Sequence, residues 1–314
     1  MKHFTPGKII LSGEHAIVHG RPAIAAPLRA GITGSFSPLA TPDIRIQVPP
    51  ILSVCLPLSS LPNQLRDIDQ RHEAFLAGKL PVTRILPEPG GLLLAAAALA
   101  KPAAGCEIHL HSTLPIGSGL GSSAALILTV LKGLLPRATP DELYPLALRG
   151  EHFQHGRSSG LDVTVCLHRL PVFAQNGSFS PLELPSGLPP FTLYHTGTPE
   201  STTGECVASV RQTHPPANPI WDRFQTVTLT LRDALISGES ETCIRAVRDN
   251  HQLLKSLGVV PHPIARAITA IEASGGAAKI CGAGSVRGDA AGTVLVLGSN
   301  PPPIPDTWQA LDVL

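Results

Sequence analysis

The 314-residue sequence has few aromatic residues and no excess of charge of either sign. Phenylalanine, tryptophan and tyrosine together make up 4% of the chain, and 24 basic residues face 23 acidic ones. A nucleic-acid interface needs a basic surface and often aromatic side chains on which bases stack. The composition therefore argues against nucleic acid or an anionic membrane as the partner, and a small anionic substrate would need a local binding site.

The chain also lacks paired cysteines and long apolar runs. Its six cysteines lie far apart and form no Cys-x-x-Cys motif, which is typical of reduced, packed thiols. The longest apolar run, residues 92–100, is about half as long as a membrane-spanning helix. The first residues contain no apolar stretch long enough for a signal peptide. We expect a cytoplasmic protein without a membrane segment.

Proline, by contrast, is abundant, with 32 residues or roughly twice the usual share. Prolines shorten helices and favour turns. The length suggests about two domains, and the proline-rich stretch 171–190 is expected to form a β-hairpin and a linker between them. Strand-like segments precede this stretch and a mostly helical half follows it. We therefore predict an α+β protein with domains at 1–180 and 181–314.

The segment LPIGSGLGSSAAL, residues 114–126, is the most informative motif. Its three glycines allow several backbone N–H groups to converge, and the apolar run that follows predicts a helix. The first turn of a helix has unpaired N–H groups and a positive dipole, so this segment can bind an anion. Ser122 or Ser123 can cap the helix. No Gly-Lys-Ser/Thr follows, which excludes the Walker pattern, and alone the segment is either a phosphate site or a plain strand–helix corner.

The periodicity of apolar residues predicts the elements around this segment. The strand predicted at 106–112 places Glu107, His109 and His111 on one face. This face could hold a metal, but no further ligand is in register nearby, which favours a half-exposed strand face. We expect strands at 4–12, 23–26, 44–48, 106–112 and 293–297, and helices at 67–77, 90–100, 122–135, 141–153, 219–237 and 240–257.

Polar residues that suit phosphoryl transfer lie outside the glycine-rich segment. Lys8 is in the first strand, the turn after it carries Glu14, Glu151 ends a helix, and Asp162 follows a glycine turn. Phosphoryl transfer to an alcohol needs a phosphate cradle, oxygen ligands for Mg²⁺, an Asp for the alcohol proton and a Lys that stabilises charge. Asp162 alone could equally be a helix cap. The combination predicts an ATP-dependent small-molecule kinase.

Five segments, in order along the chain, resemble motifs of the superfamily of galactokinase, homoserine kinase, mevalonate kinase and phosphomevalonate kinase, the GHMP kinases. Within it, the sequence is most similar to the mevalonate kinases. The resemblance implies two α+β domains with the active site in the cleft between them, ATP phosphate binding by 1–180 and the third motif in 181–314. The segments are PGK with GEHAIVHG (6–20), LPIGSGLGSSAAL (114–126), GEHFQHGRSSGLD (150–162), NHQLLKSLGV (250–259) and KICGAGS (279–285).

The resemblance also implies roles for individual residues. Asp162 matches the catalytic base and Lys8 the lysine beside it, while Ser122 and Glu151 match the ligands of Mg²⁺. It implies ATP and Mg²⁺ as cofactors, phosphorylation of the 5-hydroxyl of (R)-mevalonate in isoprenoid biosynthesis, and a possible homodimer. The ATP phosphate loop is Pro115, Gly117, Ser118, Gly119, Leu120, Gly121, Ser122 and Ser123, and the substrate contacts are Glu14, His15, Thr196, Ala283 and Gly284.

Two segments depart from the family pattern. Around Asp162, the usual proline and asparagine are missing and Arg157 stands where a small polar residue is common. In the third motif, residues 285–289 replace a run of glycines and include Arg287. Because these arginines could serve a dianionic phosphate, phosphomevalonate kinase or another GHMP small-molecule kinase is the alternative enzyme. Mevalonate diphosphate decarboxylase fits less well, and a non-catalytic ligand sensor on this fold is the alternative of a different class.

Overall fold

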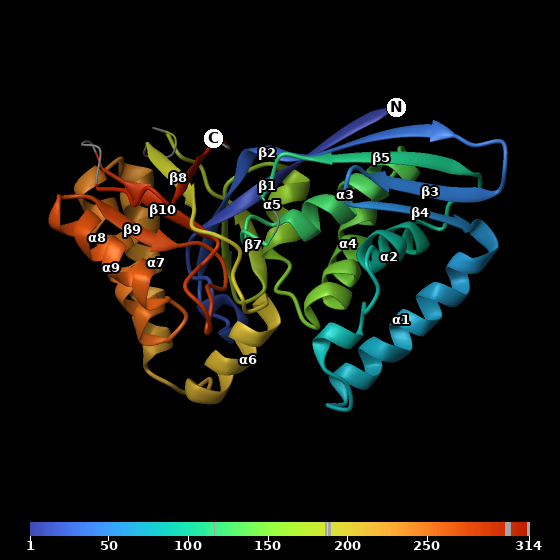
Figure 1. Ribbon diagram of the computed structural model, residues 1–314. Coiled ribbons are helices and arrows are strands. Elements are labelled where there is room, and N and C mark those ends of the chain that lie inside the picture. The colour runs from blue at the N-terminus through green and yellow to red at the C-terminus, as the bar shows by residue number, and fades with distance from the viewer. Residues whose placement is uncertain (116, 186, 188–189, 299–302, 313–314) are drawn as a thin grey trace. The chain divides into compact units, whose positions relative to one another are not determined.

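The computed structural model describes residues 1–314 except 116, 186, 188–189, 299–302 and 313–314 (Figure 1). Contacts between residues divide the chain into two compact units. Unit 1 comprises residues 1–7, 29–114 and 121–169, and unit 2 comprises residues 8–28, 115–120 and 170–314. The units interleave along the sequence, whereas we expected one boundary after residue 180. The assignment of ATP phosphate binding to 1–180 and of the third motif's domain to 181–314 stays a prediction.

Two long strands contribute to both units. β1 (Lys2–Ser12) and β2 (Ala23–Pro38) pair with each other, and β2 extends well beyond the expected residues 23–26. β1 is buried without interruption from Thr5 to Ser12. Continuous burial is typical of a strand covered on both faces, which explains why the sequence shows no alternation there.

In unit 1, strands form a sheet in the order β4, β3, β5 and the C-terminal part of β2. β3 runs antiparallel to β4 and parallel to β5. Ile44, Ile46 and Ile108 are fully buried on one face of the sheet, as the side-chain alternation of strands requires. The strands are β3 (Asp43–Val48), β4 (Leu52–Pro57) and β5 (Cys106–Ser112), and they confirm the expectations for 44–48 and 106–112.

Five α-helices and two short 3-10 helices (η2 and η3) complete unit 1, and Figure 1 shows α1 to α4 on one side of its sheet. α2 is apolar on every side and buried, as expected of a core helix. α1 begins six residues before the expected start, because Pro62 in its first turn needs no N–H partner. The elements are η2 (Leu58–Ser60), α1 (Leu61–Leu76), η3 (Val82–Arg84), α2 (Gly91–Ala100), α3 (Ser122–Leu134), α4 (Pro140–His155) and α5 (Leu161–His168).

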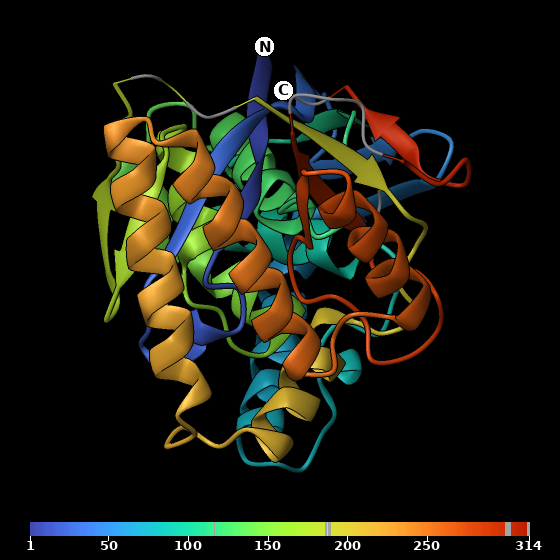
Figure 2. The ribbon, with the colours of Figure 1, turned by 90° about the vertical axis from the view of Figure 1, so that its left-hand side faces the viewer.

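Unit 2 contains a second sheet with the strand order β11, β8, β10 and β9, in which every neighbouring pair is antiparallel. α7 and α8 lie side by side (Figure 2), and α8 and α9 contact β9. Trp221, Phe224 and Ile268 belong to the core that these elements enclose. The elements are β8 (Phe191–His195), α6 (Thr203–Thr213), α7 (Ile220–Ser237), α8 (Ser240–Ser256), α9 (His262–Ala273), β9 (Ala277–Ile280), β10 (Thr293–Leu297) and β11 (Gln309–Leu311).

A β-hairpin lies within the proline-rich stretch, as predicted. β6 (Val172–Gln175) pairs with the N-terminal part of β2, and β7 (Ser178–Pro181) pairs with β6. Asn176 and Gly177 connect the two strands with φ values of 51° and 75°. Two positive φ values suit an Asn-Gly hairpin turn, which is why this stretch reverses direction at that dipeptide.

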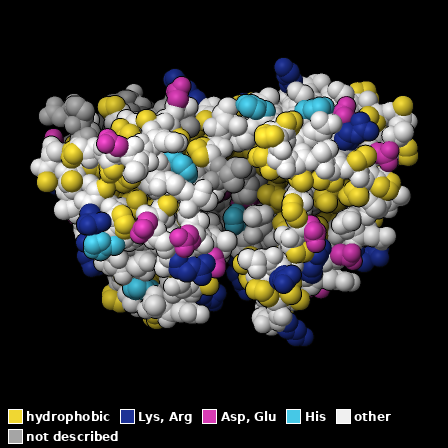
Figure 3. Space-filling model, viewed as in Figure 1, with side chains coloured by type: hydrophobic (Ala, Val, Ile, Leu, Met, Phe, Trp, Pro, Cys, Tyr) yellow, Lys and Arg dark blue, Asp and Glu magenta, His cyan; other side chains and the backbone are white. Residues whose placement is uncertain are grey.

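The exposed charges follow the balanced composition. Figure 3 shows basic and acidic side chains interspersed on the face that it displays. In the part of the chain that the structure describes, no helix combines the length and the apolar character needed to cross a bilayer.

Candidate active site

The glycines of the predicted phosphate loop are required by its backbone. Gly117, Gly119 and Gly121 have φ values of +70°, +77° and +71°, which only glycine adopts without strain. The loop ends at the N-terminus of α3, where the first N–H groups have no partner within the helix. Gly121 is the N-cap residue and no side chain caps this helix, so the expected capping by Ser122 or Ser123 is wrong.

The phosphate loop contacts the third motif backbone to backbone. A Cβ added to Gly119 would lie 2.8 Å from the carbonyl oxygen of Cys281, and one added to Gly282 would lie 3.2 Å from the Cα of Gly119. The two glycine-rich segments therefore approach more closely than any larger residue would permit. The sequence marked both segments by their glycines but did not show that they touch.

Lys8 and Ser118 stabilise the loop from within unit 2. Lys8 is buried, and its Nζ donates a hydrogen bond to the carbonyl oxygen of Gly119 (3.1 Å). The backbone N–H of Lys8 donates to the carbonyl oxygen of Leu120 (2.9 Å). Ser118 Oγ donates to the carbonyl oxygen of Pro115 (2.7 Å). The predicted catalytic lysine thus lies directly against the predicted phosphate loop.

The turn after β1 brings two predicted substrate residues into the third motif. Gly13, with φ +92°, starts the turn, and η1 (Ala16–His19) continues it. The Glu14 carboxylate forms an ion pair with the Lys279 ammonium, and His15 Nε2 lies 3.1 Å from the carbonyl oxygen of Ala283. Glu14, His15 and Ala283 therefore lie together, and their roles toward a substrate stay predictions, whereas Lys279 was not identified from the sequence.

Burial shifts the pKa of both of these groups. It raises the pKa of the Glu14 carboxyl, while the adjacent Lys279 ammonium acts in the opposite direction. Burial also lowers the pKa of His15 to about 4, so this ring is neutral at pH 7. Because a carbonyl oxygen only accepts hydrogen bonds, Nε2 carries the hydrogen of the neutral ring and donates it to Ala283. Nδ1 of His15 is then an acceptor, which suits a hydroxyl group rather than a carboxylate.

In unit 1, a histidine connects the two predicted Mg²⁺-binding segments. Glu151 on α4 is buried, and its Oε2 lies 3.8 Å from His155 Nε2. Ser123 Oγ, at the start of α3, lies 3.2 Å from the same nitrogen. A carboxylate and a hydroxyl are the hard oxygen ligands that Mg²⁺ prefers, so Glu151 and the adjacent serines Ser122 and Ser123 fit such a site. The spacing of four residues between Glu151 and His155 was the signal that sequence reasoning overlooked.

Asp162 lies in the first turn of α5 and is half-buried. Gly160, with φ +82°, is the N-cap residue, so the alternative that Asp162 caps the helix is wrong. The positive end of the helix dipole favours a charged carboxylate at this position. Asp162 and Lys8 belong to different units, and their proposed pairing stays a prediction.

Two serines organise the loop before Asp162, and the first of them, Ser158, stands where the family pattern has proline. Ser158 Oγ accepts a hydrogen bond from the Gly160 N–H (3.2 Å), and Ser159 Oγ accepts one from the Leu161 N–H (3.4 Å). Such local bonds fix a turn in the way that a proline would. Arg157 is exposed. The departure from the family pattern therefore preserves an ordered approach to the helix.

The atypical part of the third motif is held by side chains instead of glycines. Ser285 Oγ accepts from the Ser201 N–H (3.3 Å), and the Val286 N–H donates to Ser201 Oγ (3.2 Å). Arg287 Nη2 donates to Glu205 Oε1 (2.9 Å). Arg287 thus has a carboxylate partner on α6.

Thr196 and Gly284, two other predicted substrate residues, have structural partners in unit 2. Thr196 Oγ1 donates to the carbonyl oxygen of Gly292 (3.1 Å) and accepts from the Ala291 N–H (3.0 Å). A Cβ on Gly284 would lie 2.2 Å from the carbonyl oxygen of Val259. These contacts explain both residue types, and their roles toward a substrate stay predictions.

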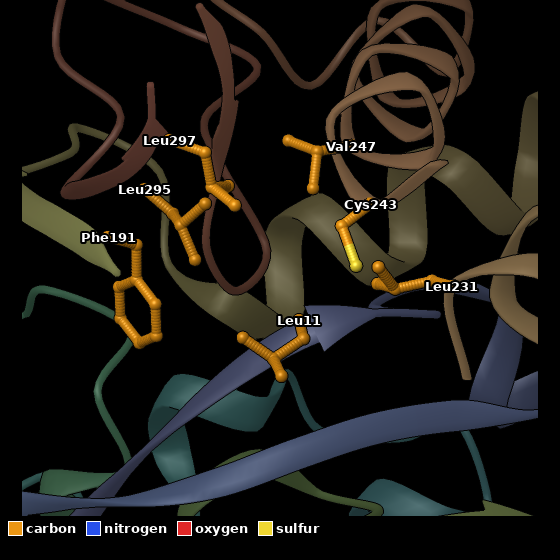
Figure 4. A pocket seen from close by; sticks show the side chains of 7 residues that line it. All are labelled: Leu11, Phe191, Leu231, Cys243, Val247, Leu295 and Leu297. Atoms are coloured by element: carbon orange, nitrogen blue, oxygen red, sulfur yellow. The ribbon is translucent and has the colours of Figure 1, made fainter. Parts of the chain in front are cut away.

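Two other polar or concave features do not qualify as sites. Glu107 pairs with Arg45 on the exposed sheet face, and no cluster of three or more metal-ligand residues occurs among the described residues. Unit 2 also contains an apolar cavity of about 20 Å³ (Figure 4), with room for about one water molecule. Its lining residues are Leu11, Phe191, Leu231, Cys243, Val247, Leu295 and Leu297.

Comparisons with known proteins extend over most of the chain. A family model described as the GHMP kinases N terminal domain matches residues 91–169. The mevalonate kinases of Thermococcus sibiricus and Thermococcus gammatolerans are 31% and 32% identical, with 89% of this chain and 85% of each relative covered. The crystal structure of the mevalonate kinase of Methanococcus jannaschii has a TM-score of 0.77 and 22% identity, covering 95% of this chain and 90% of that one.

This similarity shows that the chain belongs to the GHMP kinase family. Within that family, relatives that share about 30% identity over 89% of this chain are mevalonate kinases, so the resemblance found in the sequence motifs is confirmed. The structural match also confirms the expected α+β GHMP-kinase fold.

Proposed function

We propose that this chain is a mevalonate kinase, which transfers the γ-phosphoryl group of ATP to the 5-hydroxyl of (R)-mevalonate in isoprenoid biosynthesis. The observation that carries the proposal is the similarity to mevalonate kinases, about 30% identity over 89% of the chain. The hydrogen bond from Lys8 to the phosphate loop supports it, because this bond fixes the proposed catalytic lysine beside the loop. The contacts of Glu14 and His15 support it too, because they fix the turn that carries these two proposed substrate residues.

In this proposal the glycines of the phosphate loop and the N-terminus of α3 bind the ATP phosphates. Ser122 and Glu151 would hold Mg²⁺, and the bound ion would neutralise phosphate charge. The Asp162 carboxylate takes the proton of the 5-hydroxyl as its oxygen forms a bond to the γ-phosphorus and the bond to ADP breaks. The Lys8 ammonium stabilises the charge that develops on the transferred group.

His15 contributes to the choice of substrate. The donation of its Nε2–H to Ala283 leaves Nδ1 as an acceptor, and in the proposal this nitrogen accepts a hydrogen bond from a mevalonate hydroxyl. Thr196 and Gly284 complete the expected substrate contacts. Arg287 has Glu205 as its partner, so this arginine gives no specific support to phosphomevalonate as the substrate.

An assay of the purified protein with ATP, Mg²⁺ and either mevalonate or phosphomevalonate tests the proposal. We expect ADP formation with (R)-mevalonate and little or none with phosphomevalonate. Turnover of phosphomevalonate without turnover of mevalonate would overturn the assignment. Binding of mevalonate without any phosphoryl transfer would instead support the non-catalytic sensor.

The proposal includes a cytoplasmic location and a homodimer. All six cysteines are free, which fits a reducing compartment. The chain has a mass of 32.8 kDa, so sedimentation velocity distinguishes a monomer from a dimer directly. A single species at the monomer mass would exclude the homodimer without affecting the proposed reaction.

A further inference from the structure

Two consecutive residues of the turn after β1 are attached to the third motif at two points. Glu14 pairs with Lys279 on β9, and His15 Nε2 donates to the carbonyl oxygen of Ala283 four residues later. Both contacts lie within unit 2. Two attachments to one rigid segment fix the orientation of the turn, and not only its distance from the segment.

The Glu14–Lys279 ion pair is completely enclosed. The side chains of Lys279 and Glu14 are 0% and 1% exposed. Lys279 Nζ also donates to the carbonyl oxygen of Ile10 (3.1 Å), whereas Glu14 Oε2 has no hydrogen-bond partner among the described residues. A buried ion pair is often no more stabilising than apolar residues of similar volume. Stability alone therefore does not account for this ion pair, which points to a role in position or charge.

We propose that Lys279 is a positioning residue, which acts through Glu14 to hold His15 where it binds mevalonate. Glu14 is then a positioning residue too and does not touch the substrate, in contrast to the role expected from the family resemblance. This inference rests on the proposed function and adds to it the residue that orients the substrate side of the site.

Other charged or titratable groups surround the pair. The ammonium of Lys8 acts on the Glu14 carboxyl, and the Cys281 thiol faces Lys279, Glu14 and Lys8. His251 on α8 lies near Lys279 and is neutral. Removing the charge of Glu14 alone would therefore leave Lys279 without the carboxylate of its buried ion pair. A test of position must therefore neutralise both partners together.

The double variant Glu14→Gln/Lys279→Met keeps the approximate volumes and removes both charges. We expect the KM for mevalonate to rise by about tenfold, because the turn of His15 loses one of its two attachments to the third motif. The KM for ATP should change by less than about twofold and the melting temperature should stay near that of the wild type. A matched control is Arg21→Met/Asp222→Asn, which removes an exposed ion pair (2.7 Å) at the end of the same turn and should leave both KM values unchanged.

The wild-type protein and the variants test different claims. Absence of mevalonate turnover in the wild type refutes the proposed function. An unchanged mevalonate KM in the double variant refutes the positioning role. If the double variant does not fold, the variant Glu14→Asp tests the positioning role instead. It keeps both charges and shortens the side chain that reaches Lys279 by one methylene. A rise of several-fold in the mevalonate KM with unchanged ATP KM supports the inference, and unchanged values of both overturn it.

Discussion

At the scale of single residues, burial changes the proton affinity of two histidines. His15 and His251 are almost fully enclosed in unit 2, and burial lowers the pKa of each to about 4. The ammonium groups of Lys255 and Lys279 contribute further at His251. In the unfolded chain both histidines return to a pKa near 6.5. The unfolded state therefore binds protons that the folded state does not bind.

We predict that the free energy of unfolding decreases as the pH falls from about 6.5 to about 4. The slope should be on the order of 1 kcal/mol per pH unit for each buried histidine. The variant His251→Asn should have a smaller slope, measured by urea unfolding between about pH 5 and about pH 7. The exposed His168 provides the control, since His168→Asn should keep the wild-type slope. Equal slopes in all three proteins would show that His251 is not held neutral.

Asp162 is the residue on which the chemical step depends most directly in our proposal. The variant Asp162→Ala should lower kcat by a factor on the order of 10² to 10⁴, because the 5-hydroxyl loses its proton acceptor. The KM for ATP should change little. Steady-state kinetics with mevalonate measures both, and the exposed Asp233→Ala is the control. Full activity of Asp162→Ala would remove this residue from the role of base.

The sequence indicated the candidate residues of the proposed site more readily than the partners that the structure gives them. Lys8, Glu14, His15 and Asp162 stand in recognisable motifs with the residue types that phosphoryl transfer requires. Lys279 did not stand out, because a lysine in a strand is usually exposed and its partner Glu14 is 265 positions away. Spacing along a chain does not reveal such a pair unless the fold is known.

At the scale of elements, α4 and α6 begin with the same capping arrangement. Thr139 accepts from the Glu142 N–H while the Glu142 carboxylate accepts from the Thr139 N–H, and Thr202 and Glu205 repeat this at α6. Each of these arrangements, known as a capping box, gives a hydrogen-bond partner to two backbone N–H groups that would otherwise be unpaired at the start of the helix. In α4 the helix carries Glu151 at its other end, so the cap supports the element without touching the site.

Thr139→Ala should lower the free energy of unfolding by about 1 kcal/mol. The KM values for ATP and mevalonate should stay at their wild-type levels, because Thr139 is exposed at the opposite end of α4 from Glu151. Urea unfolding measures the first effect and kinetics the second. Arg137→Ala, an exposed change two residues earlier, is the control. A loss of less than a few tenths of a kcal/mol would show that the box contributes little.

The contact between the two glycine-rich segments gives a sharper prediction. In Gly119→Ala, the new Cβ would stand 2.8 Å from the Cys281 carbonyl oxygen at φ +77°, so the phosphate loop must move. We expect the KM for ATP to rise by about tenfold or more. Gly177→Ala is the matched control, since it imposes a similar φ of +75° with no atom within 4 Å. An unchanged ATP KM in Gly119→Ala would contradict the role of this loop.

Most elements were predictable because their apolar residues repeat at helical or strand spacing. The strand at 106–112 and the helix at 122–135 were found within a residue of their observed bounds. β11 (Gln309–Leu311) was missed, because three residues with mostly exposed side chains carry no pattern. It exists through its pairing with β8, which is a long-range interaction and leaves no local signal.

At the scale of the whole molecule, ligand binding should be visible as increased stability. A ligand at about 100 times its Kd stabilises the folded state by about 2.7 kcal/mol, which corresponds to a rise in Tm of about 5 to 10 °C. We predict such a rise with (R)-mevalonate, measured by thermal unfolding, and a much smaller one with phosphomevalonate. Equal rises with both ligands would contradict the proposed substrate preference.

The expected two-part organisation was easier to predict than its path through the chain. Length and the proline-rich stretch indicated two parts and one junction. The structure instead combines residues 8–28 and 115–120 with 170–314 in unit 2. Contacts between distant segments account for this arrangement. The backbone hydrogen bond from Lys8 to Leu120 (2.9 Å), for example, joins segments more than a hundred residues apart in the sequence. Such bonds depend on the fold and cannot be deduced from composition.

This interleaving has a consequence for synthesis on the ribosome. Residues 8–28 are made early, yet their partners in unit 2 begin only at residue 170, apart from 115–120. At ordinary translation rates about 140 intervening residues take roughly 10 to 30 s. Unit 1 is complete at residue 169, and protease protection of stalled nascent chains would reveal whether it folds first. Until residue 279 emerges, Glu14 remains a carboxylate without its partner, so the earliest translated part of the site is among the last to take its final form.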